Sequence, residues 1–258
     1  MSNPVFFTAP GTLDGLVPGA LFVLDGPEAR HAVTVKRLAV GEKVDIADGA
    51  GKRLSGKVAA VAPGELSVEC SALSDEPRPG VRLVLVQALA KGDRDQLAAE
   101  TATELGIDAV IPWQAERSIV RWKAERAAKA HAKWQSVVTA AAKQARRAWI
   151  PEVREAVDGA GLQAAVAAAD LAVILHEDAV RPLRLVLEAW QGSRPVDDAG
   201  LGREVLLIVG PEGGISPREV TRLCDAGAVT ALLGHHVLRS STAGPAATVL
   251  ASDILGRW

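Results

Sequence analysis

The segment EVLLIVGPEGGISPREV, from Glu204 to Val220, contains an abrupt change of pattern. Apolar residues run as far as Val209, glycines and a proline occupy the loop from Gly210 to Gly214, and a helical pattern follows. Ser216 followed by Pro217 is typical of a helix start, because serine caps the first N–H groups and proline fits the first turn. The segment therefore predicts a buried strand, a glycine-rich loop and a helix in succession.

The loop from Gly210 to Gly214 suits a ligand that is bound through the main chain. Glycine has no Cβ, so a ligand can approach the backbone N–H and C=O groups closely. Pro211 stiffens the loop, and Glu212 sits where it could hold a ligand or accept a proton. The order of residues matches neither the dinucleotide fingerprint nor a P-loop. A tight strand-to-helix turn without any ligand is the alternative interpretation.

Apolar runs alternate with helical patterns over the rest of the chain from Val81 onward. The expected strands are VRLVLVQAL, IDAVIPW, LAVILHED, EVLLIVG and VTALLG. The expected helices are RDQLAAETATELG, which Gly106 closes, then 125–149, LRLVLEAWQ, the segment after Ser216, and 241–255. Strands that alternate with helices predict an α/β fold with a parallel sheet and helices on both faces.

The first seventy or so residues follow a different pattern, with short runs of period-two apolarity between turn residues. Asp48-Gly49 and Pro63-Gly64 are candidate hairpin turns. This pattern predicts a small β-barrel or meander, and the linker SDEPRPG from Ser74 to Gly80 ends it. We therefore expect two domains, a β-barrel over residues 1–74 and an α/β domain over residues 80–258.

A second unusual loop, from Gly234 to Ala243, follows the last expected strand. Ligands in open α/β sheets bind beyond the carboxyl ends of the strands, where both glycine loops are expected. The two loops together predict a nucleotide-like ligand that is bound by backbone groups without a phosphate cradle.

LIVGPEGGISPREV together with LLGHHVLRSSTAGPAA resembles the paired motifs of SPOUT-class RNA methyltransferases. More narrowly, the chain is similar to the RsmE family of small-subunit ribosomal RNA uridine-N3 methyltransferases. ARHAVTVKRLAVGEKVDIADGAG, QALAKGDR, TELGIDAVIPWQAERS and WQSVVTAAAKQARRAWIPEV extend the likeness over most of the chain. The resemblance implies a PUA-like β-barrel before an α/β methyltransferase domain with a C-terminal trefoil knot, assembled as a homodimer.

The resemblance implies an S-adenosylmethionine site between three loops. Its cofactor-binding residues in this chain are Leu175, His176, Val209, Gly210, Pro211, Glu212, Gly213, Leu233, Gly234, Val237, Leu238, Ser240 and Thr242. The implied reaction methylates N3 of a uridine in 16S ribosomal RNA of the small subunit. Because N3 carries a proton, we assign Glu212 as a candidate base and Arg239 as a candidate stabiliser of charge on the uracil oxygen.

Three positions depart from the pattern of the family. Ser241 stands where the family usually has an acidic residue, which leaves it only a helix-capping role. Thr101 replaces a lysine that many members have before the TELG motif, and Val5 replaces an N-terminal arginine. The last two changes concern RNA contacts more than the cofactor.

Nine Lys and Arg residues against two acids give residues 116–149 a charge of +7 in a chain of net charge −2. A local excess of this kind is typical of a surface that contacts a phosphate backbone, although a solvated helix face is the alternative. The RNA-binding candidates in this stretch and elsewhere are His31, Arg37, Lys91, Arg94, Arg117, Arg121, Arg146 and Arg147. Trp122, Trp134 and Trp149 could stack on a base, but core or dimer packing is the favoured interpretation.

Composition excludes several other classes. With 48% hydrophobic and 23% charged residues, the chain of 258 residues can bury a core, and no segment predicts a membrane span or a secretory signal. Cys70 and Cys224 predict reduced core thiols in a cytoplasmic protein. His235-His236 lacks a third ligand at a usual spacing, so no metal is expected. The alternative functions are a non-enzymatic RNA-binding ribosome-assembly factor and a nucleotide-dependent enzyme that acts on small metabolites.

Overall fold

The computed structural model describes residues 3–193 and 202–258, and these form two units. Unit 1 contains residues 1–78 together with 142–150, and unit 2 contains residues 79–141 and 151–258. The chain therefore leaves unit 1, builds part of unit 2, returns to unit 1 for nine residues, and then completes unit 2.

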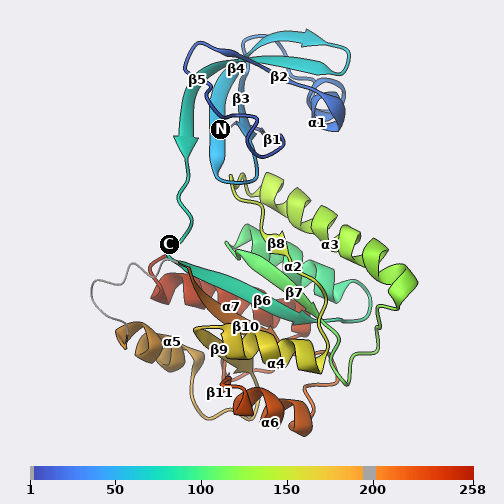
Figure 1. Cartoon of the computed structure of the whole chain (residues 1–258), viewed down its shortest axis with the longest axis vertical. Coiled ribbons are helices and arrows are strands. Elements are labelled where there is room, and N and C mark those ends of the chain that lie inside the picture. The colour runs from blue at the N-terminus through green and yellow to red at the C-terminus, as the bar shows by residue number, and fades with distance from the viewer. Residues whose placement is uncertain (1–2, 194–201) are drawn as a thin grey trace. The chain divides into compact units, whose positions relative to one another are not determined.

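Unit 1 is built around a five-stranded sheet that forms a half-barrel (Figure 1). In spatial order its strands are β1 (Val5–Phe7), β3 (Lys43–Ala47), β4 (Lys52–Ala62), β5 (Glu65–Asp75) and β2 (Leu21–Leu24). The hairpin turns expected at Asp48-Gly49 and Pro63-Gly64 are confirmed, because β3 pairs with β4 and β4 with β5 in antiparallel register. The sheet is open rather than a closed barrel, since the described residues of β1 and β2 are not paired with each other.

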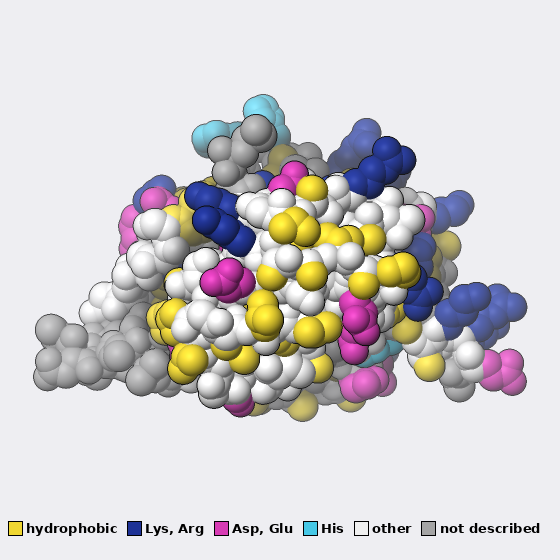
Figure 2. Space-filling view, turned by 90° about the horizontal axis from the view of Figure 1, so that it is seen from above, with side chains coloured by type: hydrophobic (Ala, Val, Ile, Leu, Met, Phe, Trp, Pro, Cys, Tyr) yellow, Lys and Arg dark blue, Asp and Glu magenta, His cyan; other side chains and the backbone are white. Residues whose placement is uncertain are grey.

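Two short helical segments, α1 (Gly26–Arg30) and the π-helix η1 (His31–Val35), follow β2 in unit 1 and were not expected from the sequence. One core of unit 1 joins them to the sheet through Ala29, Ala32 and apolar residues of β3, β4 and β5. Hydrophobic side chains also lie on the outer surface of this unit (Figure 2). The exposed large ones are Val17, Leu21, Val23, Val35, Val40 and Val61.

Residues 142–150 complete a second core of unit 1. Ala142, Ala148 and Ile150 pack with Val5 and Phe7. The indole N–H of Trp149 donates to the carbonyl of Glu76, and the ring lies against Gly51, where a Cβ would come within 2.6 Å of it. Gly51 also has a φ of +105°, so glycine is required there for two reasons.

Unit 2 contains the parallel sheet that the alternating pattern predicted (Figure 1). In spatial order its strands are β11 (Val229–Ala231), β9 (Leu171–Leu175), β10 (Arg203–Val209), β6 (Val81–Ala88), β7 (Ala109–Trp113) and β8 (Glu152–Val153). All of these pairings are parallel. Strand β10 lies between β9 and β6, so it hydrogen-bonds on both sides.

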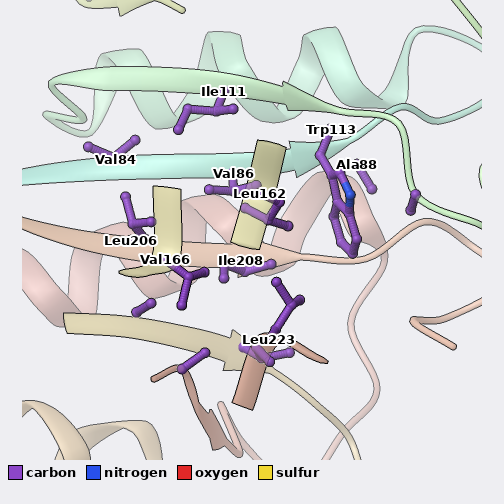
Figure 3. Close-up of a cluster of buried hydrophobic side chains, with 14 of the residues drawn as sticks. Val84, Val86, Ala88, Ile111, Trp113, Leu162, Val166, Leu206, Ile208 and Leu223 are labelled. Atoms are coloured by element: carbon purple, nitrogen blue, oxygen red, sulfur yellow. The ribbon is translucent and has the colours of Figure 1, made fainter. Parts of the chain in front are cut away.

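Alternate residues of the strands face opposite layers of helices. Val84, Val86, Leu206 and Ile208 lie on one face and pack against residues of α4 (Gly159–Ala168) and α6 (Pro217–Asp225), among them Leu162 and Leu223 (Figure 3). On the other face, α2 (Arg94–Glu104) and α5 (Leu183–Gly192) both contact α7 (Ser240–Ile254), which also packs on β6 and β10. Helix α3 (Ala124–Gln144) begins in unit 2 and continues into unit 1.

The predicted helix ends are confirmed for α2 and α6. Gly106 follows α2 with a φ of +99°, as expected of a residue that closes a helix. Ser216 caps α6 by accepting the N–H of Glu219, whose carboxylate accepts the N–H of Ser216 in return, and Pro217 opens the helix.

Three local expectations were wrong. Helix α3 ends at Gln144 rather than at Trp149, because Arg146 adopts a φ of +56° and the N–H groups of Arg146 and Arg147 bond to the carbonyls of Lys143 and Ala142. Ser241 does not cap α7, because the cap position is Arg239. Cys224 is exposed, while Cys70 is buried as expected.

Helix α4 and strand β8 were not among the predicted elements. The Ala-rich segment of α4 is apolar on most sides, so it gave no clear helical period, and β8 has only two residues. Within the described ranges no helix has both the length and the apolar character that a membrane crossing needs.

Gly244 gives the first testable prediction. A Cβ at this position of α7 would lie 2.8 Å from Leu85 Cδ1 on β6, so Gly244→Val forces apart the helix and the sheet. We expect the free energy of unfolding to fall by about 1–3 kcal/mol in urea titrations. Gly192→Ala is the control, because its Cβ meets nothing within 4 Å and alanine is the better helix former. Equal stability of Gly244→Val and the parent would contradict the close approach of α7.

Candidate functional site

A cavity of about 930 Å³ opens at the carboxyl ends of β9, β10 and β11. Because β9 lies between β11 and β10, the loops that follow these three strands meet at one edge of the sheet. The walls come mainly from residues 175–178, 209–215 and 232–240, with Arg94 from the start of α2 and Arg117 from the loop after β7. The two glycine loops noted in the sequence thus lie in one cavity.

The cavity contains nearly all of the cofactor-binding candidates. The lining candidates are Leu175, His176, Val209, Gly210, Pro211, Glu212, Gly213, Leu233, Gly234, Val237, Leu238 and Ser240. Thr242 is exposed in the first turn of α7 and does not line the cavity. Both catalytic candidates, Glu212 and Arg239, are in the wall.

The backbone of residues 233–238 is open to the cavity. Neither its N–H groups nor its carbonyls bond to any described part of the chain, whereas the adjacent Leu232 N–H bonds to Arg181 and its carbonyl accepts from Leu183. Residues 234–238 are exposed, so their backbone groups are accessible to solvent or to a ligand. Six consecutive residues with free donors and acceptors therefore form an edge that can bind the polar atoms of a ligand.

The physical reason for glycine differs from one position of the two loops to the next. A Cβ at Gly210 would come within 2.6 Å of Ile215 Cγ1, so Gly210 is explained by the packing of its own loop. Gly214 has a φ of +71° and closes a turn by donating to the Pro211 carbonyl. At Gly234 no chain atom lies within 4 Å of a Cβ, so nothing in the chain itself requires glycine there. A side chain at Gly234 would instead occupy space beside the cavity.

Glu212 is paired. Its Oε1 accepts the N–H of Lys91 at 3.2 Å and lies 3.4 Å from Arg94 Nη1, and its side chain is 28% exposed. The carboxylate therefore links the loop after β10 to the loop after β6. Arg239, by contrast, is exposed and forms no ion pair with the residues that the structure describes.

A hydrogen-bonded cluster that the sequence did not predict joins the loop after β7 to the loop after β10 and the start of α6. Arg117 Nη1 donates to the Gly213 carbonyl at 3.0 Å, and Ser216 Oγ donates to Glu116 Oε2 at 2.7 Å. The N–H of Glu116 donates to Glu219 Oε1 at 2.8 Å. The capping pattern at Ser216 was visible in the sequence, but nothing in it indicated a partner one hundred residues earlier.

His176 is oriented by its own loop. Its Nδ1 accepts the N–H of Asp178 at 3.2 Å, so the neutral ring carries its proton on Nε2. The cavity also includes Glu177, Asp178, His235 and His236, which were not among the cofactor candidates. Among the residues with described positions, no group of three His, Cys, Asp or Glu side chains could hold a metal ion.

The RNA-binding candidates fall into two sets. In unit 1, Arg37 is exposed, and Arg146 and Arg147 follow the end of α3. The His31 ring packs edge-on against Phe6 with centroids 6.0 Å apart. In unit 2, Arg94 and Arg117 line the cavity, Lys91 contacts Glu212 through its backbone, and Arg121 donates to the Glu116 carbonyl.

The tryptophans serve packing. Trp134 is 1% exposed and contacts Trp122 edge-on at 5.8 Å, and Arg78 covers the Trp149 ring at 4.1 Å. The favoured interpretation of the three tryptophans as packing residues agrees with these contacts.

Comparison with known proteins agrees with this geometry. A family model described as an RNA methyltransferase domain matches residues 76–252, and one described as an RNA methyltransferase PUA domain matches residues 24–69. The fold and the cavity thus define an RNA methyltransferase of the SPOUT class with a PUA-like N-terminal domain, as the sequence predicted.

Similar curated proteins narrow the class. Ribosomal RNA small subunit methyltransferase E of Mycobacterium bovis is 38% identical over 93% of this chain and 89% of its own length. The protein of that name from Bacillus subtilis is 29% identical over 86% of each chain. The crystal structure of this methyltransferase from Neisseria gonorrhoeae, bound to S-adenosyl methionine, is 25% identical with a TM-score of 0.78 over 98% of each chain. The chain belongs to the ribosomal RNA small subunit methyltransferase E family.

Asp95 gives a prediction about pH. The residue is 3% exposed, and its carboxylate accepts the N–H of Ala90 in the loop that leads to Lys91 and Arg94. Burial raises the pKa of the Asp95 carboxyl above its ordinary value. The folded state therefore binds more protons than the unfolded chain between the two pKa values, so stability falls as pH rises through that window.

The Asp95→Asn variant lacks this titration. We expect the free energy of unfolding of the parent, measured relative to Asp95→Asn, to be highest below the ordinary carboxyl pKa of 3.8 and to decline as the pH rises above it. Urea unfolding of both proteins over a pH series measures this difference. A difference that is constant with pH would contradict the assigned effect of burial.

Proposed function

We propose that this chain transfers a methyl group from S-adenosylmethionine to N3 of a uridine in 16S ribosomal RNA. The observation that carries the proposal is the cavity at the ends of β9, β10 and β11, with its unpaired backbone edge at residues 233–238. Its volume of about 930 Å³ lies at the upper end of the range for ligand sites. The family membership and the bound cofactor of the Neisseria gonorrhoeae relative support the same donor.

The residues present fit the donor. Free N–H and C=O groups at 233–238 match the alternating donors and acceptors of an adenine edge, and Leu175, Val209 and Leu233 supply apolar wall. Gly234 leaves the space beside that edge clear. When bound, S-adenosylmethionine supplies a methyl group that its sulfonium already activates. The chain's task is then to align the target nitrogen, which lowers the entropic part of the barrier.

Two side chains serve the target base in this proposal. N3 lies on the Watson–Crick edge of uracil, so the base has to be unpaired or extruded into the cavity. The Arg239 guanidinium, exposed in the cavity wall, stabilises negative charge on a uracil oxygen when N3 loses its proton. Glu212 accepts that proton through Oε2, while its Oε1 keeps the contacts with Lys91 and Arg94.

The two parts of the chain have separate roles in the proposal. Residues 1–74 bind RNA through the PUA-like domain, and residues 80–258 bind the donor and carry out the transfer. Exposed cations such as Arg37, Arg94 and Arg121 contact the RNA backbone. The protein acts in the cytoplasm as a homodimer, on ribosomal RNA or on the small subunit.

Gly234→Val tests the donor site. The added side chain meets no chain atom within 4 Å but intrudes beside the unpaired edge, so the fold is kept while the ligand is obstructed. We expect affinity for S-adenosylmethionine in calorimetric titrations to fall by at least about tenfold, with an unchanged melting temperature. Gly159→Val, at an open position outside the cavity wall, is the matched control and keeps the parent affinity. Failure of the parent to bind the donor would refute the proposed function.

Arg239→Ala tests the chemistry. Because the guanidinium is assigned to charge that develops only during transfer, we expect kcat to fall by about 100-fold with donor affinity unchanged. The product is measured as 3-methyluridine by mass spectrometry of nucleosides from small-subunit RNA incubated with and without the protein. RNA that binds tightly to the parent yet gains no methylated nucleoside would identify a binding protein instead.

A further inference from the structure

We propose that Glu116 and Arg117, in the loop after β7, are positioning residues that hold the loop from Gly210 to Ser216 in its donor-binding form. This inference rests on the proposed function. It gives Glu116 and Arg117 a role in donor binding that is separate from RNA contact. The two residues follow one another in the chain and bond to two different points of the same loop, its middle and its end.

Arg117 fixes the middle of the loop. Its Nη1 donates to the Gly213 carbonyl at 3.0 Å, and a Cβ on Gly213 would lie 3.4 Å from Arg117 Cβ. The arginine side chain therefore runs along the loop. Since glycine backbones are otherwise the most mobile, a charge-assisted bond at this point removes more freedom than it would elsewhere.

Glu116 fixes the end of the loop where α6 begins. Its carboxylate accepts the hydroxyl of Ser216, and its backbone N–H donates to the carboxylate of Glu219. Ser216 is 8% exposed and Glu219 is 4% exposed, whereas the Glu116 side chain is 41% exposed. Loss of the Ser216 bond would leave a buried hydroxyl without its partner, which is costly.

A third attachment lies on the other side of the loop, where Glu212 bonds to Lys91 and Arg94. The loop after β10 is thus held at Glu212, Gly213 and Ser216, from the loops after both β6 and β7. Without these bonds the donor would have to order the loop as it binds, which lowers its affinity.

Donor binding in the absence of RNA separates positioning from RNA contact. We expect Arg117→Ala to weaken binding of S-adenosylmethionine by about tenfold in calorimetry, as for loss of one charge-assisted hydrogen bond. Arg126→Ala is the matched control, since Arg126 belongs to the same basic stretch but is exposed and outside the cavity wall, and it keeps the parent affinity. Equal donor affinity of Arg117→Ala and the parent would overturn the proposal for Arg117.

The role of Glu116 is tested by comparing a conservative variant, Glu116→Gln, with Glu116→Ala. Glu116→Gln keeps an oxygen that accepts the Ser216 hydroxyl, so we expect near-parent affinity, whereas Glu116→Ala is expected to lose about fivefold or more. In kinetics both alanine variants should raise KM for the donor and leave kcat at saturating donor within about twofold. A fall in kcat with unchanged KM would overturn the positioning role, as would equal binding by Glu116→Ala and Glu116→Gln.

The controls distinguish this inference from the proposed function. If the parent binds the donor and the Arg117 and Glu116 variants bind it equally well, only the positioning role fails. If the parent itself binds no donor, the proposed function fails first. Thermal unfolding of each variant verifies that any loss of binding occurs in folded protein.

Discussion

The insertion of β10 between β9 and β6 is the constraint on which the site depends. Its backbone pairs with both neighbours in parallel register, so Val209 ends beside Gln87 of β6, and Ile208 pairs with Ile174 of β9. Strand β11 then adds to the far side of β9. The loops that follow β9, β10 and β11 are thereby brought to one edge of the sheet.

The strands of the sheet are tightly packed, whereas one of the loops at their ends has few bonds to the rest of the chain. The core strands are buried and packed on both faces, while residues 233–238 make no backbone hydrogen bond to any described residue. Segments with few internal bonds open at low free-energy cost, so binding loops are expected among them. The glycine loop differs, because bonds at Glu212, Gly213 and Ser216 restrain it from two sides. One wall of the cavity is therefore fixed and another is adaptable.

The sequence predicted the layers and the location of the site because these follow from the spacing of apolar residues and from the glycine, proline and serine residues at the ends of strands and helices. Apolar runs that end in glycine indicated the strands, and Ser216-Pro217 and Gly106 indicated helix boundaries that the structure confirms. The end of α3 was missed because Arg146, an unusual residue at positive φ, closes that helix in place of glycine. The bond from Ser216 to Glu116 could not be predicted, since a contact across one hundred residues depends on tertiary packing that no local pattern encodes.

The return of the chain to unit 1 affects how this protein can be divided or recombined. Residues 142–150 supply Ala142, Ala148 and Trp149 to unit 1, although a large part of unit 2 precedes them in sequence. A gene fragment that ends in the linker would encode a half-barrel with one apolar side uncovered. A protease that cut only that linker would separate most of unit 1 from the rest of the chain, while residues 142–150 of unit 1 would stay covalently attached to unit 2. Neither unit is a cassette that a single recombination event can transfer to another gene, so the two are expected to be inherited together.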